Sequence, residues 1–199
     1  MTRLLLVRHG QSEWNAVGRW QGWADPALTE LGNEQSRLAT TAVGPVDAVV
    51  ASDLRRALDT ATILAEGLGA GPVVVEPRWR ERDVGEWTGL TRAEIDQRWP
   101  GALATATPEP PGGESPARLV ARVLAAVERL AGDYPGEVVL VVTHGGVIRG
   151  LERHLGVDPE PLPNLGGVWL QVEAGGMVAG SRLLLIDPGD VPVTVPRQL

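Results

Sequence analysis

The sequence predicts an α/β protein in which helices cover both faces of a mostly parallel sheet. Short apolar runs alternate along the chain with segments of helical periodicity, as is typical of parallel sheets. The chain has 199 residues, 43% hydrophobic and 22% charged, which is the composition of a folded globular protein rather than a disordered one. We expect one domain over residues 1–199, with an extended tail from about residue 188.

Short runs rich in leucine and β-branched residues are the expected strands. Polar residues or glycine bound each of the first runs, as expected for strands buried on both faces. These runs are residues 4–7, 46–50 and 138–142. Two later strands, at residues 168–172 and 182–186, are expected on either side of a turn at Gly175 and Gly176.

Capping residues place the first helices between these strands. Thr29 is expected to cap a helix that runs to about residue 42. Ser52 or Asp53 is expected to cap a second helix, which runs to about residue 68 and ends at Gly69.

The second half of the chain predicts three further helices. Thr91 and Glu94 form a capping-box pattern for a short helix that stops near Pro100. An apolar stripe predicts a helix from residue 115 to about 131, and another opens at residue 145 and runs to about 155. The Pro-rich stretch between residues 99 and 113 is interpreted as a surface loop near a site.

Composition and charge exclude several classes of function. A formal net charge of -7 argues against nucleic acid as a partner. Because the chain has no cysteine, it has neither a thiolate nucleophile nor a thiolate-bound metal. No apolar run approaches the about 20 residues of a membrane span, and the first apolar stretch is too short for a signal peptide. We therefore expect a cytoplasmic protein without a membrane partner.

Two of the histidines follow a buried strand and precede a glycine. His9 comes after Arg8 at the end of the first strand, and His144 comes at the end of the strand at residues 138–142. Because ligands of open parallel sheets bind beyond the carboxyl ends of the strands, both imidazoles are expected in one place. Arg55 begins the helix after the strand at residues 46–50. These four side chains predict a positive pocket suited to a phosphoryl group.

A metal site is the alternative use of the histidines. The three histidines, at positions 9, 144 and 154, show no short-range ligand spacing, and neighbouring arginines would repel a divalent cation. All 18 basic residues are arginine, and without lysine a P-loop nucleotide site is excluded. We expect no metal and no other cofactor, and we interpret His154 as a helix-face residue.

The segment Arg8 to Asn15, with the sequence RHGQSEWN, resembles the signature of the histidine phosphatase superfamily, also called the phosphoglycerate-mutase-like family. Later segments agree with the family in order, and the resemblance extends to Gly150. These segments are residues 25–32, 52–57, 80–87, 112–115 and 142–146. The resemblance implies a phosphoglycerate-mutase-like fold with three layers, α/β/α.

The resemblance also implies catalytic roles for five residues. A neutral histidine at the position of His9 attacks phosphorus and forms a phosphohistidine, while Arg8, Arg55 and His144 hold the phosphoryl oxygens. Glu81 resembles the acid that protonates the leaving alkoxide and then acts as base for the attacking water. The alternative for Glu81 is a loop residue paired with a neighbouring arginine.

Further residues are candidates for substrate contact. Asn15 resembles the phosphate-contacting asparagine of the family, and Gln21 and Gly22 fall where family members touch substrate. Ser12 either contacts phosphate or caps the helix that follows, and Glu114 either contacts substrate or is a loop charge. Four tryptophans either wall the pocket or belong to the core: Trp14, Trp20, Trp23 and Trp87.

Two departures from the mutase pattern favour a metal-independent phosphatase that hydrolyses a small phosphorylated metabolite. Mutases usually carry a longer insertion after the Glu81 region, and asparagine where Gly146 stands. Residues 112–115 and 90–100 are similar to enzymes that act on glucosyl-3-phosphoglycerate or on α-ribazole phosphate, and broad-specificity acid phosphatases share much of this pattern.

Two other functions are kept as alternatives. One is a cofactor-dependent phosphoglycerate mutase. The other is a non-catalytic regulatory domain that binds phosphorylated ligands, and the intact set of expected catalytic residues argues against it. A homodimer is expected by analogy only.

Overall fold

A six-stranded sheet with the order β3-β2-β4-β1-β5-β6 forms the centre of the computed structural model, which describes residues 1–105 and 107–195. Strands β1 to β4 run parallel, and β5 and β6 are antiparallel additions at one edge. The expected mostly parallel sheet is therefore confirmed. The strands are β1 (Thr2–Arg8), β2 (Ala48–Ala51), β3 (Val74–Val75), β4 (Val138–Thr143), β5 (Gly166–Glu173) and β6 (Gly176–Leu184).

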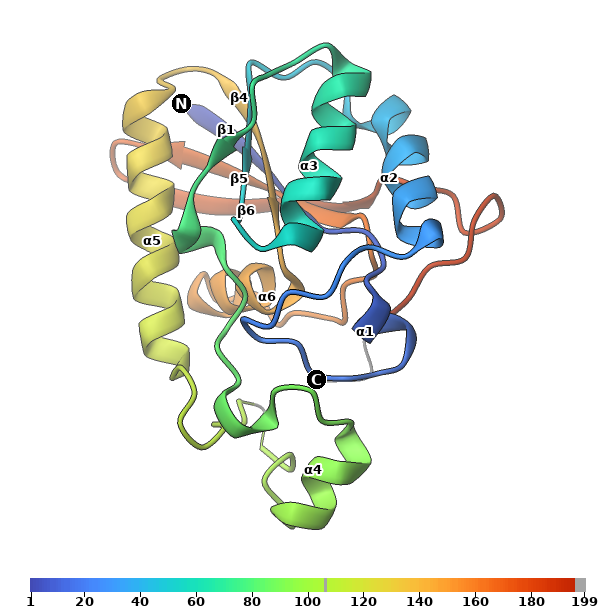
Figure 1. Cartoon of the computed structure of the whole chain (residues 1–199). Coiled ribbons are helices and arrows are strands. Elements are labelled where there is room, and N and C mark those ends of the chain that lie inside the picture. Colours follow the sequence, from blue (N-terminus) through green and yellow to red (C-terminus); the bar gives the residue numbers. More distant parts are fainter. Residues whose placement is uncertain (106, 196–199) are drawn as a thin grey trace.

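Helices cover both faces of this sheet. Figure 1 shows α5 on one side of the sheet and α2 and α3 on the other, with the short α4 set apart beyond one end of the strands. This arrangement matches the three layers expected from the sequence. The helices are α1 (Glu13–Ala16), α2 (Glu30–Val43), α3 (Arg55–Leu68), α4 (Arg92–Arg98), α5 (Pro116–Asp133) and α6 (Gly145–His154).

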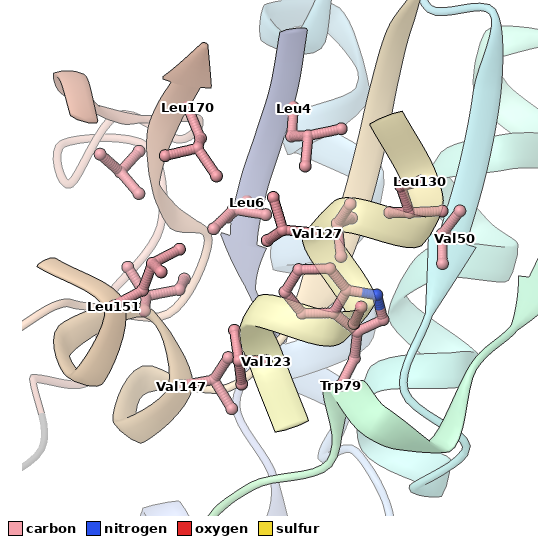
Figure 2. Packing of buried hydrophobic residues seen from close by; sticks show 14 of the residues in the cluster. Leu4, Leu6, Val50, Trp79, Val123, Val127, Leu130, Val147, Leu151 and Leu170 are labelled. Carbon is pink, nitrogen blue, oxygen red and sulfur yellow. The ribbon is translucent and has the colours of Figure 1, made fainter. Parts of the chain in front are cut away.

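Alternating residues of the strands build two separate hydrophobic cores. Leu4 and Leu6 of β1 point to the face covered by α5 and α6, where Trp79 is fully buried among them (Figure 2). Leu5 and Val7 point to the opposite face and pack against α2 and α3. Because both faces of the strands are buried, their sequences are continuous apolar runs rather than alternating ones.

Capping residues fix most helix boundaries where the sequence places them. Thr29 caps α2 through the N–H of Gly32 at 3.0 Å. The capping box of Thr91 and Glu94 opens α4. Gly69 ends α3 in the left-handed conformation that glycine adopts without strain.

The start of α3 and the limits of β6 differ from the sequence-based expectation. The helix begins after Leu54, with no side-chain cap, because the Ser52 hydroxyl instead accepts the N–H of Leu54 in a local turn. The last strand runs over Gly176–Leu184 rather than residues 182–186, so the hairpin turn is tighter than expected. Helix α1 is the helix after Ser12 that the capping alternative requires. Strand β3 was not expected and is too short for a periodic signal.

The segment after residue 188 has no helix or strand up to residue 195, yet contacts anchor it to the body of the protein. Gln35 donates to the carbonyl of Pro192 at 2.6 Å, and Arg8 donates to the carbonyl of Thr194 at 3.3 Å. Val191 is buried in the core on the α2 and α3 face. The remainder of the expected tail, residues 196–199, lies outside the described residues.

No helix in residues 1–105 and 107–195 combines the length and the apolar character needed to cross a membrane.

Candidate active site

The two strand-end histidines meet at the carboxyl edge of the sheet. Arg8 and Thr143 are register partners in the parallel ladder of β1 and β4, so the next residues, His9 and His144, leave the sheet side by side. Their ring centroids lie 5.2 Å apart at 64°. Ser52 follows the neighbouring strand β2 and lies 3.0 Å from His144 Nε2. The expected convergence of the imidazoles is therefore confirmed.

The surroundings of His9 leave one ring nitrogen available as a nucleophile. Nδ1 lies 2.6 Å from the carbonyl oxygen of Gly10, which can only accept a hydrogen bond, so Nδ1 carries the proton. Burial, and then the charges of Arg56 and Arg8, hold the pKa of His9 well below its usual value. At neutral pH the ring is uncharged, and Nε2 has a free lone pair.

Two buried guanidinium groups flank His9. Burial lowers the pKa of Arg8 to about 9, with a smaller contribution from Arg149, and lowers the pKa of Arg56 to about 10. Arg8 donates to the carbonyl of Leu162 at 2.7 Å, and Arg56 donates to the carbonyl of Gly22 at 2.9 Å. Neutral carbonyls do not balance these charges. A bound anion would, so the pocket is built for one.

The expected placement of Arg55 in this pocket is wrong, and Arg56 takes the place. The Arg55 side chain is 63% exposed and pairs with Asp59 on the outer face of α3. Arg56 is fully buried and lines the pocket. The signal lay in the helical period, because Arg56 shares the buried face of α3 with Thr60 and Leu64.

His9 lies in a cavity of about 550 Å³, a size suited to a small metabolite. Near His9, its polar lining comprises Arg8, Asn15, Gln21, Gly22, Arg56 and Glu81. Residues from the start of α5 form an apolar wall: Pro116, Ala117, Leu119, Val120, Ala121 and Leu124. The cavity therefore joins a charged base to an apolar side.

Backbone N–H groups and a glycine hold the Glu81 carboxylate at the cavity. Its Oε1 accepts the N–H of Arg82 at 2.7 Å, and its Oε2 accepts the N–H of Gly146 at 3.1 Å, in the first turn of α6. A Cβ atom added to Gly146 would lie 2.2 Å from Oε1. Glycine at position 146 is therefore what allows the carboxylate to rest against the helix.

The structure does not place Glu114 in the pocket. Its carboxylate forms a nearly buried ion pair with Arg122, with N···O distances of 2.7 and 2.8 Å. The same Arg122 donates to the backbone carbonyls of Arg78, Arg80 and Glu81. The expectation of substrate contact is thus wrong for Glu114, which instead holds the arginine that fixes the Glu81 segment.

Of the remaining candidates for substrate contact, three line the cavity and one, Ser12, supports a neighbouring side chain. Ser12 is buried outside the lining, caps α1 and donates to the Gln21 side chain at 2.7 Å, so the capping alternative is the one observed. Asn15, Gln21 and Gly22 line the cavity. The Oδ1 atom of Asn15 accepts from Ser12 and Asn164, which leaves its NH₂ group as the donor for a ligand.

Only one of the four tryptophans lines the cavity. Trp20 does so, and its ring packs edge-to-face on Trp87 at 5.3 Å. Trp87 is fully buried, and Trp14 packs against Gly89. Trp23 is exposed and donates to the Glu81 carbonyl at 2.7 Å. The core alternative therefore fits Trp87 best.

Sequence reasoning assigned no role in the site to three residues that lie in it or support it. Arg149 and Arg82 line the cavity, and Asn164 donates to the backbone carbonyl of His9 at 2.8 Å. The position of Arg149 one turn after Gly145 would have placed it on the same helix face as the site. His154, expected to be a plain helix-face residue, is exposed and also borders the cavity.

No group of three or more metal-ligating side chains occurs within the described ranges, which hold every histidine of the chain. The donor set at the cavity base is two arginines beside imidazoles, which suits an anion and opposes a cation.

Comparisons with known proteins agree with this geometry. The sequence model of the Histidine phosphatase superfamily (branch 1) matches residues 4–172 of this chain. The chain belongs to this superfamily. A solved mycobacterial glucosyl-3-phosphoglycerate phosphatase in complex with VO3 superposes with a TM-score of 0.81 at 35% identity, covering 89% of this chain and 96% of that one. The expected family and its phosphoglycerate-mutase-like fold are confirmed.

Relatives of this chain include both phosphatases and a phosphoglycerate mutase. Glucosyl-3-phosphoglycerate phosphatase of Mycolicibacterium vanbaalenii is 38% identical over 85% of this chain and 83% of its own length. Metal-independent phosphoserine phosphatase of Arabidopsis thaliana is 38% identical over 76% of this chain and 67% of its own length. A 2,3-bisphosphoglycerate-dependent phosphoglycerate mutase of Parvibaculum lavamentivorans is 38% identical over 76% and 79%. The phosphatases support the prediction of a phosphomonoesterase.

Proposed function

We propose that this chain hydrolyses a small phosphomonoester through a phosphohistidine at His9, with a phosphoglycerate derivative such as glucosyl-3-phosphoglycerate as substrate. The observation that carries the proposal is the neutral His9, with its Nδ1 proton held by the Gly10 carbonyl between two buried arginines. A nucleophile that is uncharged in a cationic pocket suits attack on an anionic phosphoryl group.

In the first step, His9 Nε2 forms a bond to phosphorus and the bond from phosphorus to the ester oxygen breaks. Arg8 and Arg56 stabilise the charge on the phosphoryl oxygens. Glu81 acts as the general acid of this step and gives a proton to the leaving alkoxide. The alcohol departs, and Glu81 remains as a carboxylate.

In the second step, Glu81 takes a proton from water as the water oxygen attacks phosphorus. The bond from phosphorus to His9 Nε2 breaks, which returns the neutral imidazole and releases inorganic phosphate. His144 does not line the cavity, but its ring lies against His9 and its buried Nδ1 has no hydrogen-bond partner in the described part of the chain. We therefore assign His144 a supporting role beside His9 rather than direct contact with the phosphoryl oxygens.

Phosphoglycerate mutase activity is the second candidate, because one relative carries that name. The position of Gly146 favours hydrolysis. The asparagine expected there in mutases would begin with a Cβ atom 2.2 Å from Glu81 Oε1, so the acid would have to leave its place. A cytoplasmic location and a homodimer stay predictions.

A metabolite screen tests the proposal. Phosphate release from phosphorylated metabolites, with glucosyl-3-phosphoglycerate and 3-phosphoglycerate among them, is measured with and without 2,3-bisphosphoglycerate. We expect phosphate release that needs no bisphosphoglycerate and is lost in His9→Ala. Isomerisation of 3-phosphoglycerate that depends on bisphosphoglycerate, with little phosphate release, would replace hydrolysis by phosphoryl transfer.

A further inference from the structure

Arg149 carries a buried positive charge that the mechanism does not use. Its residue is 5% exposed, it lies on the inner face of α6, and it lines the same cavity as His9. Neither Nε nor Nη1 has a hydrogen-bond partner in the described part of the chain. Burying a guanidinium group without a partner is costly, so such a group indicates a missing ligand.

The nearby carboxylates are already engaged elsewhere. Glu152, three residues further along α6, forms a bidentate pair with Arg182 at 2.7 Å. Both Glu81 oxygens accept backbone N–H groups. Burial lowers the pKa of Arg149, and the charge of Glu81 raises it. Arg153 and Arg182 lower this pKa further, and Glu152 raises it slightly. The protein therefore leaves Arg149 without an anionic partner of its own.

A second guanidinium group in the cavity lining is partly unpaired. Arg82 lines the cavity, and its Nη2 is buried without a partner, while its Nε donates to the Glu114 carbonyl at 2.7 Å. Burial lowers the pKa of Arg82, whereas the carboxylates of Glu81, Glu109 and Glu114 raise it. Arg153 lines the same cavity and lowers the pKa of both Arg82 and Arg149. We call Arg82, Arg149 and Arg153 the outer basic cluster.

The outer basic cluster is adjacent to the phosphoryl site. A point at the Cβ position of Gly145 lies 3.6 Å from Arg149 Nη1 and 3.5 Å from Arg8 Cδ. Arg8 and Arg56 already supply two guanidinium groups to a phosphoryl dianion.

We propose that Arg149, with Arg82, binds a second anionic group on the substrate, a carboxylate or a second phosphoryl group close to the ester that is cleaved. This inference rests on the proposed function, and it names the class of phosphomonoester that the site selects. The organic part of the substrate packs on the apolar wall from α5. A phosphomonoester without a second anionic group leaves the two guanidinium groups unpaired and reacts more slowly.

Matched ester pairs test the proposal. 3-Phosphoglycerate and glycerol 3-phosphate differ by a carboxylate in place of a hydroxymethyl group. The bisphosphate and monophosphate of propane-1,3-diol differ by the second phosphoryl group. We expect Arg149→Met to lower kcat/KM for the member with the second anionic group about tenfold or more beyond its effect on the member without it, as for a lost charge-assisted hydrogen bond.

Two further variants separate recognition from structure. Arg149→Lys keeps the charge and should recover part of the preference. Arg118→Met, at an exposed position of α5 outside the cavity lining, makes the same change in net charge and should leave the preference unchanged. If Arg149→Met lowers the preference within the 3-phosphoglycerate pair, the second group is a carboxylate. If it lowers the preference within the propanediol pair, the second group is a phosphoryl group. Equal losses for both members of both pairs overturn the proposal.

Binding to the His9→Ala variant distinguishes this inference from the proposed function. Calorimetric titration with 3-phosphoglycerate and glycerol 3-phosphate needs no turnover. If the wild-type protein hydrolyses neither ester, but His9→Ala binds 3-phosphoglycerate more tightly and loses this preference with Arg149→Met, the function fails and the second anion site stands. Equal affinity for the two esters in His9→Ala rules out the site, even where hydrolysis is observed.

Discussion

The two neighbouring arginines of α3 offer a matched test of which side chain holds the phosphoryl group. Arg56→Met removes a guanidinium group that lies in the pocket and donates to the carbonyls of Gly22 and Ala24 at 2.9 and 2.7 Å. Arg55→Met makes the same chemical change one residue earlier, on a side chain that is 63% exposed. The expected effects differ in kind as well as in size.

The contacts of each arginine set the magnitude of its loss. Removing one preorganised donor to a transition-state oxyanion costs about 2.7–4 kcal/mol, so kcat/KM of Arg56→Met should fall by about 10² to 10³. Loss of its hydrogen bonds to two carbonyls should also lower the free energy of unfolding by about 1.5–3 kcal/mol. The ion pair of Arg55 with Asp59 contributes only about 0.3–0.5 kcal/mol to the free energy of unfolding. Because Arg55 is outside the cavity lining, Arg55→Met should change kcat/KM by less than about twofold.

Steady-state hydrolysis of p-nitrophenyl phosphate, with urea unfolding of the same samples, measures both effects. Arg56→Lys keeps the charge without the planar fork and should lie between the wild-type protein and Arg56→Met. Inhibition by vanadate should weaken in Arg56→Met and stay unchanged in Arg55→Met. A large loss of kcat/KM in Arg55→Met, with Arg56→Met near the wild-type value, would refute the assignment.

Four further outcomes are expected. Glu81→Gln should slow 3-phosphoglycerate much more than p-nitrophenyl phosphate, since only the poor leaving group needs the proton; equal losses would point to another acid. Gly146→Ala, with an added Cβ 2.2 Å from Glu81 Oε1, should reproduce that leaving-group dependence without a shift in Tm, and an unchanged profile would contradict the contact. Arg122→Met should give a weaker form of the same leaving-group dependence, because the Glu81 segment is displaced, and should also lower Tm. A lower Tm with an unchanged leaving-group dependence would show a purely structural role. Chelator treatment should leave activity unchanged, and a loss restored by a divalent ion would revive metal catalysis.

The pH dependence of stability follows from the lowered pKa of His9. Because the folded protein holds this ring neutral, the unfolded chain binds more protons between the lowered pKa and about 6.5. Stability from this group is complete above about pH 6.5 and falls as the pH drops below it, by about 1.4 kcal/mol per pH unit. Urea unfolding of the wild-type protein and His9→Gln across this range measures the difference, and identical slopes would show a normal pKa.

The layers and the meeting of the histidines could be predicted because they depend on local signals. Continuous apolar runs identified the buried strands, and the residues just after them were bound to meet at one edge of a parallel sheet. Thr29, Thr91 and Ser115 sit at helix starts that their own side chains cap, so sequence alone located them. These boundaries needed no knowledge of tertiary packing.

The errors concern residues whose role is set by packing between distant segments. Arg55 and Arg56 are adjacent, and only the burial of one face of α3 against the sheet separates them. Glu114 was assigned to substrate contact because its actual partner, Arg122, is eight residues away in the sequence and reaches it only in the folded chain. Arg149 belongs to no short motif, and its burial without a partner is visible only in the folded chain.

The most direct test of the central claim is to trap the covalent intermediate. Rapid alkaline quenching during turnover of labelled substrate, followed by peptide mapping, should place an acid-labile, base-stable phosphoryl group on His9, and none on the His9→Ala protein. Label on another residue, or inversion at phosphorus with no trapped label, would contradict nucleophilic attack by His9.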